Sequence, residues 1–161
     1  DTPEDFYNRL RINIDLCEEL NVAIYSFPMK YCPIDDARYF ANRDYIGRHW
    51  NRKFIRAIQA IINATKGKVG RGRDFFEKAF GKNLDEFKEL LYMPETFIIY
   101  RLKYEDNLTE EWREKFLSLN VDERIEAERV IKQNKFSDED VSIVTSANIR
   151  ELLKFYQIRR G

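Results

Sequence analysis

A cysteine and the single histidine of the chain lie in one segment that is rich in aromatic residues and proline. A thiol at Cys32, an imidazole at His49 and a carboxylate at Asp35 or Asp36 are the groups of an activated cysteine nucleophile. No known nucleophile motif surrounds Cys32. An inert or buried thiol is therefore the alternative interpretation.

The same residue types are too few for a metal centre. The chain has two cysteines, Cys17 and Cys32, and one histidine. Zinc sites use three or four clustered protein ligands. Because Cys32 with His49 lacks the third and fourth, we predict no metal site in this chain.

Charge is unevenly distributed along the sequence. Segment 43–73 has nine Lys or Arg and one acid, whereas segment 105–140 has twelve acids and six bases. Within the basic segment, Arg48, Arg52 and Arg56 recur every four residues, which places them on one stripe of a helix. Such a stripe can neutralise an anionic partner.

A glycine-rich turn follows the arginine stripe. Residues 67–73 read GKVGRGR, and free amides beside Lys68, Arg71 and Arg73 suit an anion. The turn is neither a Walker A loop nor a GxGxxG fingerprint. The basic residues and nearby aromatic rings could also hold nucleic acid. Two interpretations without a ligand remain: a solvated connection, and arginines paired with the acidic segment.

Helices are the main elements predicted to position these residues. Thr2, followed by a proline and two acids, begins a helix that extends to about Leu20. Segment 22–27, VAIYSF, is short, apolar and aromatic, which predicts a strand that Pro28 ends. No nearby segment is predicted to pair with this strand, although backbone groups need partners.

The rest of the chain has helical patterns separated by capping residues. Helices are predicted over residues 49–65, 74–80, 84–92, 95–104, 110–119, 122–135 and 147–156. The fold class is therefore mainly α, a multi-helix domain with one short N-terminal strand.

Three phrases carry a resemblance to a known family. They are DTPEDFYNRL at residues 1–10, YSFPMKYCP at 25–33 and YIGRHW at 45–50. Together they resemble the C-terminal portion of a group of uncharacterised radical SAM proteins. The resemblance implies that residues 1–34 are the last helix–strand unit of a partial barrel. Residues 35–161 would be a helical C-terminal region packed with that unit.

The resemblance also implies where a cofactor would lie. Residues that leave the last barrel strand line the cofactor pocket, and Phe27, Pro28, Met29 and Tyr31 match that position. The family holds its [4Fe–4S] cluster with a CxxxCxxC motif, which this chain lacks. We therefore expect S-adenosylmethionine and the cluster to be bound by the remainder of a parent protein, the expected partner, and this chain alone to be inactive.

The predicted function is the substrate-side C-terminal region of a radical SAM enzyme, in which the basic residues grip an anionic substrate. The chain begins Asp1-Thr2-Pro3 without an initiator methionine, so we expect it to be a piece of a longer protein. Its charged composition, without a signal peptide or membrane segment, predicts a cytoplasmic location. The alternative is a helical module that binds nucleic acid or protein through segment 43–73.

Overall fold

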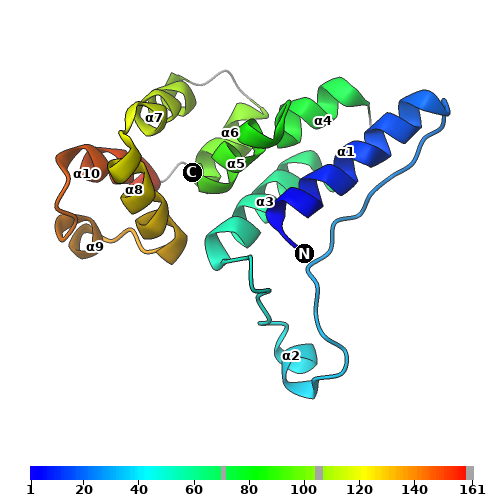
Figure 1. Cartoon of the computed structure of the whole chain (residues 1–161), viewed down its shortest axis with the longest axis horizontal. Coiled ribbons are helices and arrows are strands. Elements are labelled where there is room, and N and C mark those ends of the chain that lie inside the picture. The colour runs from blue at the N-terminus through cyan, green and yellow to red at the C-terminus, as the bar shows by residue number, and fades with distance from the viewer. Residues whose placement is uncertain (70–71, 104–106, 159–161) are drawn as a thin grey trace.

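The computed structural model describes residues 1–69, 72–103 and 107–158, and helices dominate them (Figure 1). The ten α-helices of these ranges are α1 (Pro3–Glu19), α2 (Ala37–Asn42), α3 (Arg52–Thr65), α4 (Arg73–Phe80), α5 (Leu84–Tyr92), α6 (Glu95–Arg101), α7 (Asn107–Ser118), α8 (Val121–Gln133), α9 (Asp138–Ser142) and α10 (Ala147–Lys154). A short 3-10 helix, η1 (Phe155–Gln157), follows the last of them. The mainly α fold class is confirmed.

Capping residues determine where several helices begin. Thr2, Asn120 and Ser137 each form a capping box, in which the cap side chain and the third helical residue bond each other's backbone amides. Several boundaries differ from the prediction, two of them at the start of a helix by three residues. Asn51 caps α3, so this helix starts after His49, and α7 already begins at Asn107. The helix predicted over 95–104 ends at Arg101, and residue 104 lies outside the described ranges.

The predicted strand at residues 22–27 is not formed in the described part of the chain. The segment is extended, but its only ladder contact there is one antiparallel bridge between Ser26 and Val69. The Ser26 amide donates to the Val69 carbonyl at 3.4 Å. The apolar composition fitted a strand, yet a strand also needs a neighbour along its length. No described segment supplies one.

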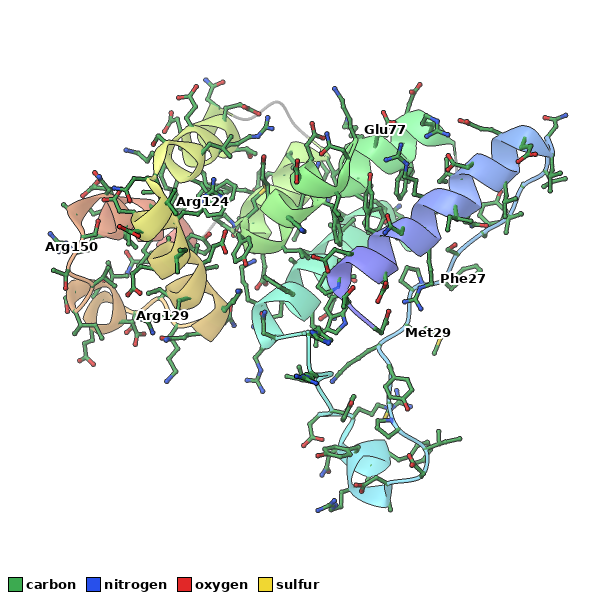
Figure 2. All side chains as sticks on the ribbon, viewed as in Figure 1. Phe27, Met29, Glu77, Arg124, Arg129 and Arg150 are labelled. Atoms are coloured by element: carbon green, nitrogen blue, oxygen red, sulfur yellow. The ribbon has the colours of Figure 1, made fainter. Side chains whose placement is uncertain are left out.

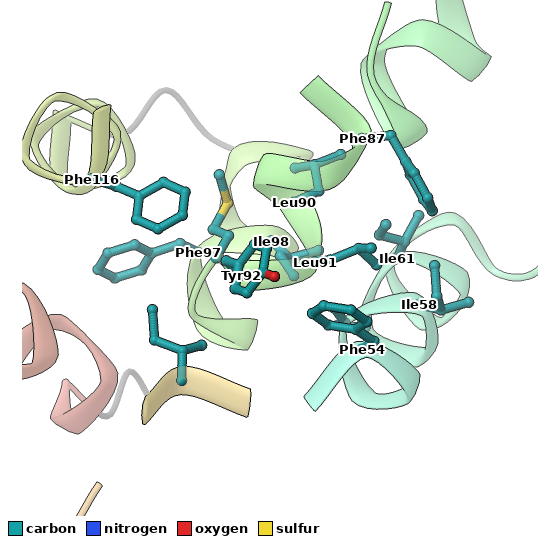
Figure 3. Close-up of a cluster of buried hydrophobic side chains, with 14 of the residues drawn as sticks. Phe54, Ile58, Ile61, Phe87, Leu90, Leu91, Tyr92, Phe97, Ile98 and Phe116 are labelled. Carbon is teal, nitrogen blue, oxygen red and sulfur yellow. The ribbon is translucent and has the colours of Figure 1, made fainter. Parts of the chain in front are cut away.

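The hydrophobic core lies between α3, α5, α6 and the helices of the C-terminal half (Figure 3). Ile61, Phe87, Phe97 and Ile98 are fully buried in it. At the C-terminal end, Trp112 stacks on Phe116 with ring centroids 4.8 Å apart. Close packing of aromatic rings and aliphatic side chains in this core holds α3 and α5 in fixed positions. The other segments pack against these two helices or lead away from them.

Helix α1 covers one side of this frame, where it packs on α4 and α5 (Figure 1). It buries Tyr7, Leu10 and Ile14, and the Tyr7 hydroxyl donates to the Gly81 carbonyl at 3.1 Å. The chain then leaves the body as a long excursion that carries α2 at its far end (Figure 1). None of the described helices is long and apolar enough to cross a membrane.

Candidate functional site

Most residues predicted to form a site lie on an arm, which we define as residues 22–51 between α1 and α3. The first part of the arm runs back along α1 and is attached to it by side chains. Asn13 Nδ2 donates to Ser26 Oγ at 2.7 Å and to the Ile24 carbonyl at 3.4 Å. The Ile24 amide donates to Cys17 Sγ at 3.3 Å. Cys17 thus has a structural contact that joins the arm to α1.

Exposure alternates along this first part of the arm. Even-numbered residues from Ile24 to Pro28 are half-buried. The odd-numbered residues from Tyr25 to Tyr31 are exposed and apolar or aromatic, namely Tyr25 at 55%, Phe27 at 76%, Met29 at 87% and Tyr31 at 68%; Val22 and Lys30 are exposed as well. Figure 2 shows Phe27 and Met29 pointing away from the body. A period of two is typical of a β-strand with two different faces, although here the apolar face is open.

The far end of the arm is a small aromatic cluster. The ring of Tyr45 makes edge contacts with those of Tyr31 and Tyr39, at centroid distances of 5.7 and 5.1 Å. The Cys32 thiol donates to the Tyr39 carbonyl at 3.1 Å. His49 is exposed, and no hydrogen bond joins it to Cys32 in the described structure.

Asp36 also has a structural contact. Its carboxylate accepts a hydrogen bond from the Arg38 amide at the start of α2 and pairs with the Arg38 guanidinium at 2.9 Å. The hydrogen bond from the Arg38 side chain holds the pKa of Asp36 below its usual value. The structure therefore does not assemble a cysteine, histidine and carboxylate into a nucleophilic site.

The arginine stripe is only partly available to a ligand. Arg56 forms two hydrogen bonds with Glu95, at 2.7 and 2.9 Å. Arg48 and Arg52 are exposed, and no ion pair of either occurs in the described residues. The partner of Arg56 lies outside the acidic segment 105–140, which was the partner that one interpretation predicted.

The cations of the glycine-rich turn also differ in whether they are available to a ligand. Arg73 pairs with Asp15 at 2.6 Å and with Glu18 at 2.7 Å. Two carboxylates beside one guanidinium disfavour an added anion. Lys68 is exposed beside Val69, so the bridge to Ser26 brings its backbone near that of Phe27. Arg71 lies outside the described residues.

The predicted binding residues thus do not gather in one place. Phe27, Pro28 and Lys68 lie near the arm's bridge to the turn after α3, whereas Arg52 and Arg48 lie at or before the opposite end of α3. Neither cavity found in the described structure is lined by the cofactor-pocket candidates. Their cofactor-binding role stays a prediction.

The larger cavity, about 730 Å³, lies between the end of α4, α5 and the beginning of α7. Charges of both signs line it, and Arg113 pairs there with Glu89 at 2.7 Å. Arg101 donates to the Ala79 carbonyl at 2.6 Å and so caps the end of α4. Its Nε is buried and has no hydrogen-bond partner in the described structure. Burial lowers the pKa of Arg101 to about 10.

Lys53 is a buried cation that the sequence interpretation missed. Its side chain is 1% exposed, and its Nζ donates to the Leu91 carbonyl at 3.0 Å and the Met93 carbonyl at 2.7 Å. Burial lowers the pKa of Lys53 to about 7. One signal was present: Lys53 precedes Ala57 by four positions and Ile61 by eight, on the apolar face of α3.

No group of three or more metal-binding side chains occurs in the described ranges. No protein-family model matches the chain, and no match was found among curated proteins or solved structures. The radical SAM resemblance therefore depends on the three sequence phrases.

Proposed function

We propose that this chain is the substrate-side C-terminal region of a radical SAM enzyme. In this proposal, residues 1–34, with α1 and the first part of the arm, complete a partial barrel, and residues 35–161 form a helical extension beside its mouth. The observation that carries the proposal is the arm's open apolar face, formed by Tyr25, Phe27, Met29 and Tyr31. An exposed apolar patch of this kind is typical of a surface that another polypeptide covers.

Helix α1 supports the same interpretation. Its buried face packs on the body, but Ile12, Leu16 and Leu20 are 57%, 39% and 58% exposed. Their spacing of four forms a second apolar stripe. In barrels of alternating strands and helices, a helix packs on the sheet and on its neighbours, so helix and strand both need apolar faces. An open helix stripe beside an open strand face fits one unit of such a barrel.

The residues of this chain do not fit an iron–sulfur cluster. Cubane clusters are held by thiolates from several cysteines, whereas this chain has two, Cys17 and Cys32. Both sulfur atoms already bond backbone groups of the chain itself. The cluster and S-adenosylmethionine would therefore be bound by the remainder of the parent protein. Phe27, Pro28, Met29 and Tyr31 would border the cofactor, and the protein would act in the cytoplasm.

Substrate contacts in this proposal come from exposed cations. Arg48, Arg52 and Lys68 are exposed, while the guanidinium groups of Arg56 and Arg73 are paired with carboxylates. Because Lys68 lies at the opposite end of α3 from Arg48 and Arg52, a small anionic substrate would contact only one of these two groups. A nucleic acid needs many phosphate contacts, so the alternative function as a nucleic-acid-binding module has less support.

The test begins with the reading frame upstream of Asp1 in the source gene, which should encode CxxxCxxC. The upstream polypeptide, expressed with this chain, should then co-purify with it. Phe27→Asp should abolish co-purification, because it places a charge in the covered face. Val121→Asp is the matched control, since Val121 on α8 is equally exposed at 76%. An upstream frame without the motif, or equal effects of both variants, would refute the proposal.

A further inference from the structure

The hydrogen-bonding groups of the arm are used on one edge only. In an extended chain, the amide and carbonyl of one residue point to one edge, and those of the next residue point to the other. On the even-numbered edge, the Ser26 amide bonds the Val69 carbonyl and the Ile24 amide bonds Cys17 Sγ. Asn13 occupies the Ile24 carbonyl. The chain's own residues therefore close this edge at Ile24 and Ser26.

The odd-numbered edge is open. No backbone hydrogen bond of Tyr25, Phe27 or Met29 to another described residue occurs. Proline would interrupt such an edge, because it has no amide hydrogen to donate. Pro28, however, is even-numbered, so its missing donor falls on the closed edge. The open edge keeps an uninterrupted set of donors and acceptors.

We infer that this open edge pairs with one β-strand of the parent protein, through the backbones of Tyr25, Phe27 and Met29. This inference rests on the proposed function and specifies its docking surface. Because the other edge is closed by Val69 and α1, the arm is a terminal strand with a single neighbour. The sheet that the arm completes is consequently open at this point. The apolar odd-numbered side chains of the arm lie on the face of this sheet that the rest of the parent protein covers.

A strand from a second copy of this chain is a weaker occupant. Pairing two arms edge to edge would produce a two-stranded ribbon, which is at best marginally stable in water. Side chains stand perpendicular to a sheet, so that ribbon would leave Phe27 and Met29 of both copies exposed. A neighbouring strand within a larger sheet satisfies the backbone and also brings a surface over these side chains.

Proline substitutions distinguish the two edges. Met29→Pro removes a donor from the open edge. Lys30→Pro, the adjacent control, removes one from the even-numbered edge, and Lys30→Ala separates that change from the loss of the hydrogen bond that Lys30 Nζ donates to the Arg43 carbonyl. We expect Met29→Pro to weaken binding to the upstream polypeptide about tenfold, since it removes one hydrogen bond and leaves its partner unpaired. Lys30→Pro should change binding by less than about twofold. Unfolding followed by circular dichroism would show that both variants keep the helical fold.

Residue-resolved amide exchange gives the second readout. On complex formation, the amides of Tyr25, Phe27 and Met29 should become protected, and that of Lys30 should not. A complex that forms without this alternation would overturn the inference but leave the proposed function intact. Failure of the two polypeptides to associate would overturn both. Concentration-dependent protection of the same amides in this chain alone would identify a second copy as the occupant and also overturn the inference.

Discussion

Lys53 makes the free energy of unfolding depend on pH. Its ammonium group is enclosed by α3, α5 and α6 and contacts two carbonyls rather than a carboxylate. Burial is the main cause of its lowered pKa; Glu95 acts in the opposite direction, and Arg56 acts in the same direction. The unfolded chain keeps the ordinary lysine value of 10.5. Between these values, the unfolded state binds more protons than the folded state.

The sign and size of the effect follow from proton linkage. Where the unfolded state holds the extra proton, raising the pH stabilises the folded state by at most about 1.4 kcal/mol per pH unit. With folded and unfolded values of about 7 and 10.5, the gain from pH 7 to pH 9 is about 2 kcal/mol. Below pH 7 both states are protonated, so the slope from Lys53 disappears there.

The pH range in which Lys53 can be studied ends near the ordinary pKa of tyrosine. Burial raises the pKa of Tyr7, Tyr92 and Tyr156 in the folded state. Above about pH 10 the unfolded chain loses these protons first, so the tyrosines then favour unfolding. Measurements should therefore stop at pH 9.5.

Lys53→Met is the perturbation that isolates the effect. Urea unfolding at pH 6, 7, 8 and 9, followed by circular dichroism, gives the free energy for both proteins. Subtracting the two profiles removes every other group that titrates in this range. At pH 9 the variant should be less stable, because the neutral amine still donates hydrogen bonds, whereas methionine leaves the Leu91 and Met93 carbonyls unpaired, at about 1–3 kcal/mol each.

The difference between the two proteins should shrink by about 2 kcal/mol from pH 9 to pH 7. A difference that is constant with pH would refute the assigned burial effect. If the variant does not fold, the ¹³Cε chemical shift of Lys53 in the unaltered protein reports its titration directly. A midpoint above pH 9 would contradict the same reasoning.

Two further predictions concern backbone geometry and surface charge. Gly81→Ala should destabilise the protein by more than about 2 kcal/mol, because the residue has φ +93° and an added Cβ would lie 2.8 Å from the Phe87 amide. Gly67→Ala, with φ +69° and open space around it, should cost only about 1 kcal/mol. Thermal unfolding measures both variants, and equal losses of stability would show that the close contact at Gly81 is irrelevant. Arg56→Met should cost no more than about 1 kcal/mol at low salt, since its pair with Glu95 is partly exposed. That loss should fall in 1 M NaCl, and a larger, salt-independent loss would contradict a surface ion pair.

Local signals predicted much of the helical framework. Thr2 was identified as a cap from the proline and two acids that follow it, and it does cap α1. The helix predicted over 74–80 also ends where predicted, at Phe80, with Gly81 as its C-cap. These elements depend on contacts within one turn of a helix, so composition and spacing contain the needed information.

Long-range contacts account for what the sequence did not predict. Lys53 is buried because α5 presents carbonyls to it, 38 and 40 positions away. Arg73 was predicted to be a free cation, but its guanidinium is paired with Glu18, 55 positions earlier. Residue type identified both as cations, but only tertiary packing determines whether a cation faces a carbonyl, a carboxylate or solvent.

The arm joins these two kinds of information. Its apolar and aromatic composition is a local property that the sequence contains, whereas the alternation of exposure from Ile24 to Met29 is visible only in the structure. A strand, however, is defined by its neighbour, and the described chain supplies only Val69, opposite Ser26. The segment therefore has the side-chain pattern of a strand without the ladder. This mismatch is what a terminal strand should display when its one neighbour belongs to another part of a protein. The same segment would become a regular strand if that neighbour bound to the edge formed by Tyr25, Phe27 and Met29.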